Sequence, residues 1–258
     1  MVNGRRQRKN SVDWLIRMSA KKKIIIVAVC FLVALGVLSL IAPKLLPARD
    51  GSLERMVKQL QTLEFKKELP DNQKQTLFEQ FKRYRDELNK GILAIEQEGP
   101  RVEAILYWPL IQIGNVYRDA GDYARAETSW LLAHRIQPGA FVPLGNLGEL
   151  YFRYVKDYQK AEEYYLKAVQ IKSDYLETFY YELYQLYRFF LKDEARAEEV
   201  LIQGIKQYPE ETNILAQLAL HYRQTGQIEK AISRYNELLV KKPDSAVAKR
   251  ALTELTGK

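Results

Sequence analysis

The sequence predicts an all-α fold, a helix-turn-helix solenoid with a C-terminal capping helix, preceded by a single transmembrane helix. Three observations lead to this fold class. A run of 19 residues, 24–42, carries no charge. A pattern of about 35 residues then recurs four times over residues 107–243. Within each recurrence the apolar residues stand three or four positions apart, which is the spacing of one face of a helix.

The uncharged run has the length of a membrane span. At 1.5 Å per residue it would extend about 28 Å, close to the roughly 30 Å hydrocarbon core of a bilayer. Lys21–Lys23 precede it, and Pro43 and Pro47 follow it. Residues 4–23 hold eight lysines and arginines, whereas residues 43–62 hold four. Because the more cationic flank stays inside, we expect a cytoplasmic N-terminus and a solenoid on the extracytoplasmic side.

A cleaved signal peptide is the competing interpretation of this run. Signal peptides have apolar cores of about 7–15 residues and a cleavage site between small residues. The run here is longer, and residues 43–47 offer no such site. We therefore predict an uncleaved signal anchor at 24–42, a basic cytoplasmic tail at 1–23, and a single-pass protein of the cytoplasmic (inner) membrane.

The basic tail accounts for most of the net charge of +8, which comes from 40 Lys+Arg and 32 Asp+Glu in 258 residues. Residues 1–23 contain eight cations and one acid, a net of +7, so the rest of the chain has a net charge of +1. A nearly neutral solenoid argues against nucleic acid as a partner. Residues 11–42 are expected to contact membrane lipid, with Trp14 at headgroup depth in an interfacial helix. A disordered basic tail before the span is the alternative.

Three positions define the repeat that follows. A tyrosine recurs at intervals of 34 to 36 residues, an alanine follows it nine or ten positions later, and a large apolar residue stands four positions after the alanine. A hairpin of two such helices cannot bury its own apolar face, so neighbouring hairpins must stack. The tyrosines are Tyr117, Tyr151, Tyr187 and Tyr222, and the alanines are Ala126, Ala161, Ala197 and Ala231.

This pattern resembles the tetratricopeptide-repeat family, whose unit is a helix-turn-helix of 34 residues. The resemblance divides the chain into repeats one to four, followed by a capping helix. Repeats two and three contain one extra residue between the tyrosine and the alanine, which we place in the turn. The predicted boundaries are 107–140, 141–174, 175–210 and 211–244 for the repeats and 245–258 for the capping helix.

Repeat three also departs from the pattern where its two helices cross. Tyr184 stands at the position that Gly114 occupies in repeat one and Gly148 in repeat two. A glycine lets two helix axes approach closely. We therefore expect the helices of repeat three to lie farther apart.

Residues 43–106 are predicted to be helical but do not match the repeat. One apolar stripe covers residues 53–63 and a longer one residues 77–95, with Pro70 between them. Stripes of this width usually face a core, so we predict a helical linker or an N-terminal capping hairpin that packs on repeat one. A coiled-coil stalk that dimerises is the alternative, which leaves the question of a homo-oligomer open.

No catalytic motif accompanies the repeats. The chain has no phosphate-binding glycine loop, no H-E-x-x-H and no nucleophile elbow. Cys30 and two histidines leave too few ligands for a cysteine-rich metal site. His134 and His221 fall within predicted helices, where we expect partly exposed structural residues. The sequence predicts that the protein is not an enzyme and holds no cofactor or metal.

The resemblance implies a concave groove, lined by the first helix of each repeat, that binds an extended or helical segment of another protein. Four arginines recur every 35 residues near the ends of these helices. Arginine presents a planar fork to carboxylates, and asparagine can bond a peptide backbone. We hypothesise that the groove recognises an acidic segment or a free C-terminus. The candidate site consists of Asn115, Arg118, Asn146, Arg153, Tyr181, Arg188 and Arg223.

A structural interpretation of the arginines is the alternative. The helix dipole favours cations near a helix C-terminus, and the turn acids Asp119, Asp157 and Asp193 can pair with them. The sequence alone leaves both interpretations open.

Together these features predict a membrane-anchored scaffold or assembly factor that holds a segment of a partner protein in the groove. The alternative is a membrane-tethered chaperone or substrate receptor for translocated or imported proteins. A scaffold would bind one partner, whereas a chaperone would bind many clients.

Overall fold

The computed structural model describes residues 52–171, 173 and 177–257. The chain divides into two compact parts, Met1–Ser52 and Leu53–Lys258, and the described residues belong almost wholly to the second. The predicted basic tail, signal anchor and lipid contact lie outside the described residues. Within the described part, no helix is both long enough and apolar enough to cross a bilayer.

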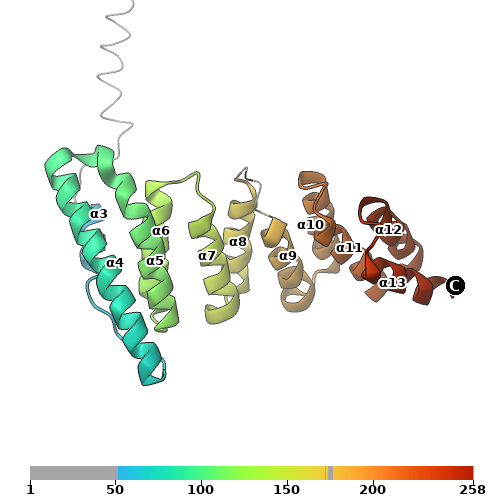
Figure 1. Ribbon diagram of the computed structural model, residues 1–258, viewed down its shortest axis with the longest axis horizontal. Helices are drawn as coiled ribbons and strands as arrows, with labels where there is room; N and C mark the ends of the chain where they lie inside the picture. Colours follow the sequence, from blue (N-terminus) through green and yellow to red (C-terminus); the bar gives the residue numbers. More distant parts are fainter. Residues whose placement is uncertain (1–51, 172, 174–176, 258) are drawn as a thin grey trace, which may run out of the picture. The chain divides into compact units, whose positions relative to one another are not determined.

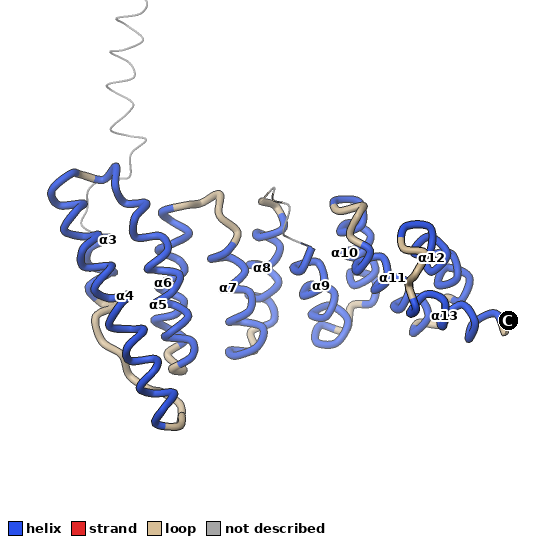
Figure 2. The backbone as a smooth tube through the Cα atoms, in the orientation of Figure 1, coloured by secondary structure: helices blue, strands red, loops and turns tan. Residues whose placement is uncertain are grey.

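Every regular element of the described residues is helical, and consecutive helices pack side by side (Figures 1 and 2). This arrangement confirms the predicted all-α solenoid. Repeat one consists of α5 and α6, repeat two of α7–η2 and α8, repeat three of α9–η3 and α10, and repeat four of α11 and α12. The elements are α3 (Ser52–Lys58), α4 (Asp71–Glu98), η1 (Pro100–Leu106), α5 (Tyr107–Asp119), α6 (Tyr123–Ile136), α7 (Val142–Glu149), η2 (Leu150–Val155), α8 (Tyr158–Val169), α9 (Glu177–Gln185), η3 (Leu186–Leu191), α10 (Glu194–Gln207), α11 (Thr212–Gln224), α12 (Ile228–Lys241) and α13 (Ala246–Thr256).

The N-terminal helices α3 and α4 cover the outer side of repeat one. Leu60, Phe81 and Leu88 are buried in the same core as Tyr117 of α5. The rings of Phe81 and Tyr117 meet edge to face, with centroids 5.7 Å apart. The Tyr117 hydroxyl donates a hydrogen bond of 3.0 Å to the carbonyl of Thr62. The apolar stripes of residues 53–63 and 77–95 therefore face this core.

One aromatic ring fills the helix crossing in each of the first three repeats. In repeat one a Cβ added to Gly114 would lie 2.5 Å from the indole nitrogen of Trp130. Repeat two has the same combination of glycine and ring. In repeat three the ring comes from the first helix, because Tyr184 is buried there and the second helix supplies the smaller Leu201. The large and the small residue have exchanged helices in repeat three, so the ring that fills this crossing comes from the first helix instead of the second.

The recurring tyrosines of repeats two to four connect each of these repeats to the one before it. Their hydroxyls donate hydrogen bonds to glutamates on the second helix of the preceding repeat. Burial, together with this hydrogen bond, raises the pKa of Tyr222 to about 12, so its hydroxyl keeps its proton at neutral pH. The pairs are Tyr151 with Glu127, Tyr187 with Glu162 at 3.0 Å, and Tyr222 with Glu198 at 2.8 Å.

The extra residue of repeats two and three lies in the last turn of the first helix, and its predicted place in the connecting turn is wrong. η2 and η3 are π-helical, a form that takes up additional residues within a turn. Each is followed by a left-handed lysine, Lys156 with φ 62° and Lys192 with φ 57°. Repeats one and four have Gly121 and Gly226 at this position, with φ 83° and 75°. The left-handed conformation costs a non-glycine residue about 1–2 kcal/mol.

An aspartate begins the second helix of repeats one to three. Asp122, Asp157 and Asp193 each accept a hydrogen bond from the backbone N–H three positions later. Such N-caps satisfy donors that a helix start otherwise leaves free. Gln227 stands at this position in repeat four and forms no side-chain cap.

Candidate partner-binding surface

The first helix of each repeat presents an open side. In α5, Trp108, Gln112, Asn115 and Asp119 stand at i, i+4, i+7 and i+11, the spacing of one helix face, and none of them is buried. Asn146 of α7 is likewise half-buried. All seven residues of the predicted site lie in first helices and remain accessible. We call this open side of α5, α7–η2, α9–η3 and α11 the first-helix face.

The arginines of the first-helix face form ion pairs that connect successive repeats. Arg118 Nη1 lies 3.7 Å from Glu149 Oε2 of the next repeat. Arg153 Nη2 lies 2.7 Å from Glu182 Oε1 of the repeat after that, and Arg153 Nε lies 4.0 Å from Glu149 Oε1. The four side chains therefore form one chain of alternating charge across repeats one to three.

Arg188 differs because its nearest partners are a tyrosine and a histidine, while Glu194 Oε2 of α10 lies farther away, 3.9 Å from its Nη1. Its Nη1 lies 3.1 Å from the Tyr184 hydroxyl and 2.7 Å from His221 Nδ1. Arginine only donates hydrogen bonds, so Nδ1 accepts and the neutral ring carries its proton on Nε2. Burial, followed by the Arg188 charge, lowers the pKa of His221. His221 is 1% exposed, so the prediction that it is partly exposed is wrong; it packs between repeats three and four.

The turn acids account for only part of this pairing. Asp119 does pair with Arg118, at 2.9 Å. Asp157 and Asp193 instead cap the second helices α8 and α10. The predicted pairing of these two acids with the first-helix arginines is therefore wrong: Arg153 pairs with Glu182 of the next repeat, and Arg188 contacts His221 and Glu194.

Arg223 ends the arginine series and pairs with Glu254 of α13 at 3.2 Å. Arg223 and Arg153 are more exposed than the other two arginines. A carboxylate of a partner can reach them, but it must exchange with the intramolecular carboxylate already present. The exposed side-chain fractions are 20% for Arg118, 46% for Arg153, 11% for Arg188 and 37% for Arg223.

Large exposed rings accompany the arginines. The predicted Tyr181 is 43% exposed, and Trp108 and Phe189, which the sequence analysis missed, are 60% and 48% exposed. The rings of Tyr181 and Tyr184 stack with centroids 6.3 Å apart, and the Arg188 guanidinium carbon lies 5.5 Å from the centroid of Phe189. Repeat three thus presents an aromatic cluster around an arginine. The available signal was that both missed rings stand outside the buried stripe of their helix.

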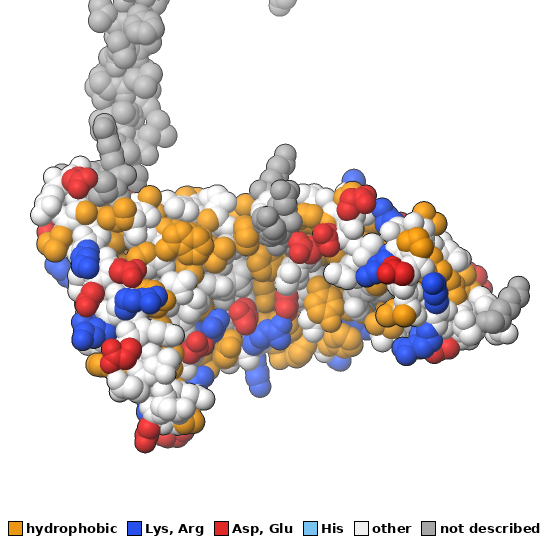
Figure 3. Space-filling view, viewed as in Figure 1, with side chains coloured by type: hydrophobic (Ala, Val, Ile, Leu, Met, Phe, Trp, Pro, Cys, Tyr) orange, Lys and Arg blue, Asp and Glu red, His pale blue; other side chains and the backbone are white. Residues whose placement is uncertain are grey.

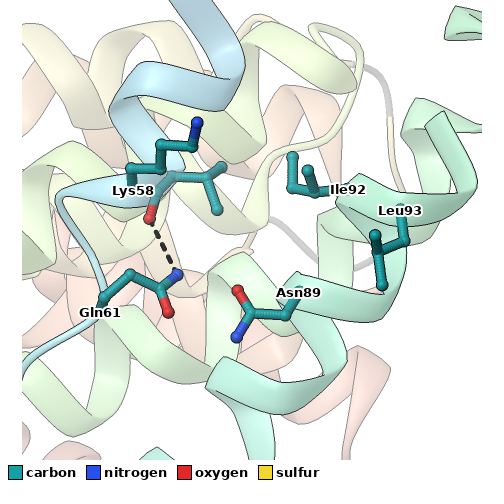
Figure 4. A pocket seen from close by; sticks show the side chains of 6 residues that line it. Lys58, Gln61, Asn89, Ile92 and Leu93 are labelled. Atoms are coloured by element: carbon teal, nitrogen blue, oxygen red, sulfur yellow. Dashed lines mark hydrogen bonds between the residues drawn. The ribbon is translucent and has the colours of Figure 1, made fainter. Parts of the chain in front are cut away.

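A cavity of about 390 Å³ opens between α3, the residues just after it and α4 (Figure 4). Its wall is mainly apolar, and Gln61 Nε2 donates a hydrogen bond of 3.3 Å to the carbonyl of Val57 at its rim. Such a space can accept apolar side chains, and no carboxylate lines it. The lining residues are Val57, Lys58, Gln61, Asn89, Ile92 and Leu93.

Among residues 52–171, 173 and 177–257, no three His, Cys, Asp or Glu side chains gather as metal ligands would. The polar groups of the first-helix face are amides, guanidinium groups and carboxylates that pair with them. This arrangement can bind a peptide through backbone hydrogen bonds, carboxylate exchange and contact with exposed rings.

Comparison with known proteins supports the resemblance. The family model of the tetratricopeptide repeat matches residues 143–175, which is most of repeat two. No curated protein matches the sequence. A similar helical array occurs in YrrB, described as a TPR protein with an unusual peptide-binding site, at 19% identity and a TM-score of 0.44, over 64% of this chain and 81% of YrrB.

Two further solved structures are similar at the same level. A MamA protein is 20% identical with a TM-score of 0.45, over 64% of this chain and 93% of MamA. A chain of the APC/C hetero-tetramer Cut9–Hcn1 is 19% identical with a TM-score of 0.42, over 63% of this chain and 34% of its own length. At these values the similarities carry no information on what this chain binds.

Proposed function

We propose that this protein is a membrane-anchored scaffold or assembly factor whose first-helix face binds a segment of a partner protein. The observation that carries the proposal is the recurrence of accessible side chains on four successive first helices, with Trp108, Tyr181 and Phe189 exposed among them. Exposed aromatic side chains supply much of the binding energy in protein interfaces. A segment that crosses several repeats would cover these rings together.

The segment is proposed to be acidic or to end in a free carboxylate. Arg153 is 46% exposed and is held by Glu149 and Glu182. An incoming carboxylate can replace Glu182 without leaving the guanidinium unpaired. Burial disfavours the charged form of Glu182 and raises its pKa, against the lowering effect of Arg153. Release of this carboxylate to water therefore offsets part of the desolvation cost of the incoming carboxylate.

Capture of the partner by the full chain, from detergent-solubilised membranes, tests the face. The wild-type chain should retain one partner in stoichiometric amount. A triple alanine variant of Trp108, Tyr181 and Phe189 should reduce the captured amount about tenfold or more, because three aromatic contacts are lost. The control replaces three exposed apolar residues of second helices by alanine, Leu131, Ile202 and Val240, which are 37%, 44% and 84% exposed.

Equal loss of the partner by both triple variants, or by neither, would contradict the proposal. Many proteins captured in small amounts by wild type and control alike would favour the chaperone alternative instead.

The acidic character of the segment needs its own variants. Arg153→Glu should weaken capture about tenfold, since it replaces a cation by an anion at the exchange site. Glu182→Gln should strengthen capture, because it removes the nearer competing carboxylate and leaves Arg153 with only Glu149, at 4.0 Å. A Glu182→Gln protein that captures less partner than wild type would show that the ion pair serves only the fold.

The anchor and its orientation are proposed from the sequence of residues 1–62 alone. The span at 24–42 would hold the solenoid on the extracytoplasmic side of the inner membrane, with the basic tail in the cytoplasm. Protease added to sealed vesicles of known orientation measures this directly. Digestion of the solenoid from the cytoplasmic face would contradict the orientation, and release of intact chain by alkaline extraction would contradict the anchor.

A further inference from the structure

Exposed apolar side chains gather where η2 and η3 end. Val155 is 43% exposed and Phe190 is 45% exposed. Lysines follow both helix ends, so apolar and cationic surface lie next to each other along the border below α8 and α9 in Figure 3. We define the turn edge by Val155, Lys156, Tyr158, Phe190 and Lys192.

The ring of Phe190 bridges repeats two and three. Its centroid lies 4.9 Å from the ring of Phe152 and 5.0 Å from the ring of Tyr158. Part of Phe190 is thus packed against repeat two, while nearly half of it remains open to solvent. An apolar side chain of another protein can extend this aromatic contact by covering the open part.

The lysines of the turn edge are not neutralised by the described part of the chain. Lys156 and Lys192 are exposed, and neither pairs with an acid among the described residues. The neighbouring aspartates are engaged, because Asp157 caps α8, and Asp193 caps α10 and pairs with Arg196 at 2.7 Å. The two ammonium groups are therefore available to an anion, whereas the nearest carboxylates are held by the fold.

The outer repeats lack this combination of features. Repeat one has Ala120 and Gly121 at the corresponding end of its first helix, and repeat four has Thr225 and Gly226. Repeat two has Val155 directly before the left-handed Lys156, and repeat three has Phe190 and Leu191 before the left-handed Lys192. The apolar surface and the unpaired charge occur together only in the two repeats that lie side by side, within the described residues.

We propose that the turn edge is a second docking surface, which binds an acidic segment of a partner protein that carries an aromatic or long aliphatic side chain. This side chain covers Phe190, and carboxylates on either side of it pair with Lys156 and Lys192. A basic segment would give Lys156 and Lys192 no anion, and a purely polar segment would leave the open part of Phe190 exposed to water. The turn edge lies at the ends of the first helices and the first-helix face along their sides. The inference therefore goes beyond the proposed function and does not depend on it.

A fluorescent peptide of alternating glutamate and phenylalanine is a direct probe. Its control is a twin peptide with lysine in place of glutamate. The full chain, reconstituted in nanodiscs of neutral lipid, should bind the acidic peptide about tenfold or more tightly than the twin in fluorescence anisotropy. Phe190→Ser should lower the affinity for the acidic peptide by a similar factor, whereas Ile202→Ala, at a side chain of α10 that is 44% exposed, should leave it unchanged.

The double variant Lys156→Gly and Lys192→Gly separates binding from folding. Glycine adopts the left-handed conformation more readily than lysine, so the variant should unfold at the same temperature as wild type or a higher one. It should nevertheless bind the acidic peptide about five- to thirtyfold more weakly, since two ion pairs are lost.

Two results would overturn the proposal. One is equal affinity of the double glycine variant and wild type for the acidic peptide, or no preference for this peptide over its twin. The other is capture of anionic-lipid vesicles that depends on the two lysines, without peptide binding, which would make the turn edge a lipid contact. A failure of either kind leaves the first-helix face to its own test, because that test uses different residues.

Discussion

Repeats one and four differ from repeats two and three at the end of the first helix. The outer repeats turn through a glycine at positive φ, Gly121 or Gly226. The inner repeats insert a residue, widen into a π-helical turn and end in Lys156 or Lys192. The core does not share this difference, since the recurring alanine is fully buried in all four repeats.

This comparison shows that the core limits the size of a residue, whereas the turn tolerates a change in the number of residues. At the helix crossing a change of residue size must be matched across the interface, as Tyr184 and Leu201 match each other in repeat three. At the surface end of the helix an extra residue is accommodated locally. The inner repeats accept lysine where glycine fits better, and they expose Phe190 as well. The left-handed lysines and the exposed phenylalanine do not improve packing, which indicates that these residues serve binding.

The largest expected effect tests whether the cores are alike. Trp130→Ala in repeat one and Tyr184→Ala in repeat three should each lower the free energy of unfolding by about 3–5 kcal/mol, because each empties a buried ring position. Chemical denaturation followed by circular dichroism measures both. Val240→Ala, at a side chain 84% exposed, should change it by less than about 0.5 kcal/mol. A loss below 1 kcal/mol for Tyr184→Ala alone would show that the inner core is packed differently.

Replacing the N-cap residue of the second helix should destabilise repeat one much more than repeat four. Asp122 is 1% exposed, caps α6 and pairs with Arg125 at 2.6 Å and Lys66 at 3.2 Å. Asp122→Ala should therefore lower the free energy of unfolding by about 2 kcal/mol. Gln227→Ala removes no cap and should lower it by a few tenths of a kcal/mol. Equal losses in parallel denaturation curves would refute this assignment of the caps.

The turn residues should respond with opposite signs. Gly121→Ala forces a Cβ into the left-handed region and should cost about 1–2 kcal/mol. Lys156→Gly relieves the same strain and should raise the free energy of unfolding by up to about 1 kcal/mol, less the entropy that glycine adds to the unfolded chain. Thermal unfolding of the two variants provides the comparison. Destabilisation by both would mean that the lysine side chain contributes to the fold.

The smallest expected effect is a loss of stability at acid pH that arises from His221, between repeats three and four. The pKa of His221 is lowered in the folded state by burial and by Arg188, while Glu194 acts in the opposite direction. The unfolded chain therefore binds the proton more tightly, and stability should fall as the pH drops below about 6.5. His221→Gln should reduce this slope in melting temperature measured from pH 7.5 to 5. Identical slopes for the two proteins would exclude His221 as its source.

Much of the fold could be predicted because it depends on local periodicity. Ala126 and Trp130 stand one helical turn apart, and the same spacing returns in every repeat. The described helices follow this pattern, and their all-helical stacking confirms it. The place of the extra residue could not be predicted in this way, since a wider helix and a longer turn contain the same number of residues.

The candidate site was less predictable because its contacts are distant in sequence. Glu182 lies 29 positions after Arg153, and His221 lies 33 positions after Arg188. Their pairing depends on how adjacent repeats stack. Trp108 stands outside the buried stripe of α5, but how far it is exposed depends on which neighbouring elements leave it uncovered. The anchor at 24–42 stays a prediction, since it lies outside the described residues.

Photo-crosslinking in intact cells tests the proposed role of the first-helix face most directly. A crosslinking amino acid would replace Trp108, Tyr181 and Phe189, one at a time. The controls replace Leu131, Ile202 and Val240, second-helix residues that are 37%, 44% and 84% exposed. We predict that the three first-helix positions crosslink to the same partner protein and that the three controls do not. Crosslinks from the controls to that partner, without crosslinks from the first helices, would contradict this account.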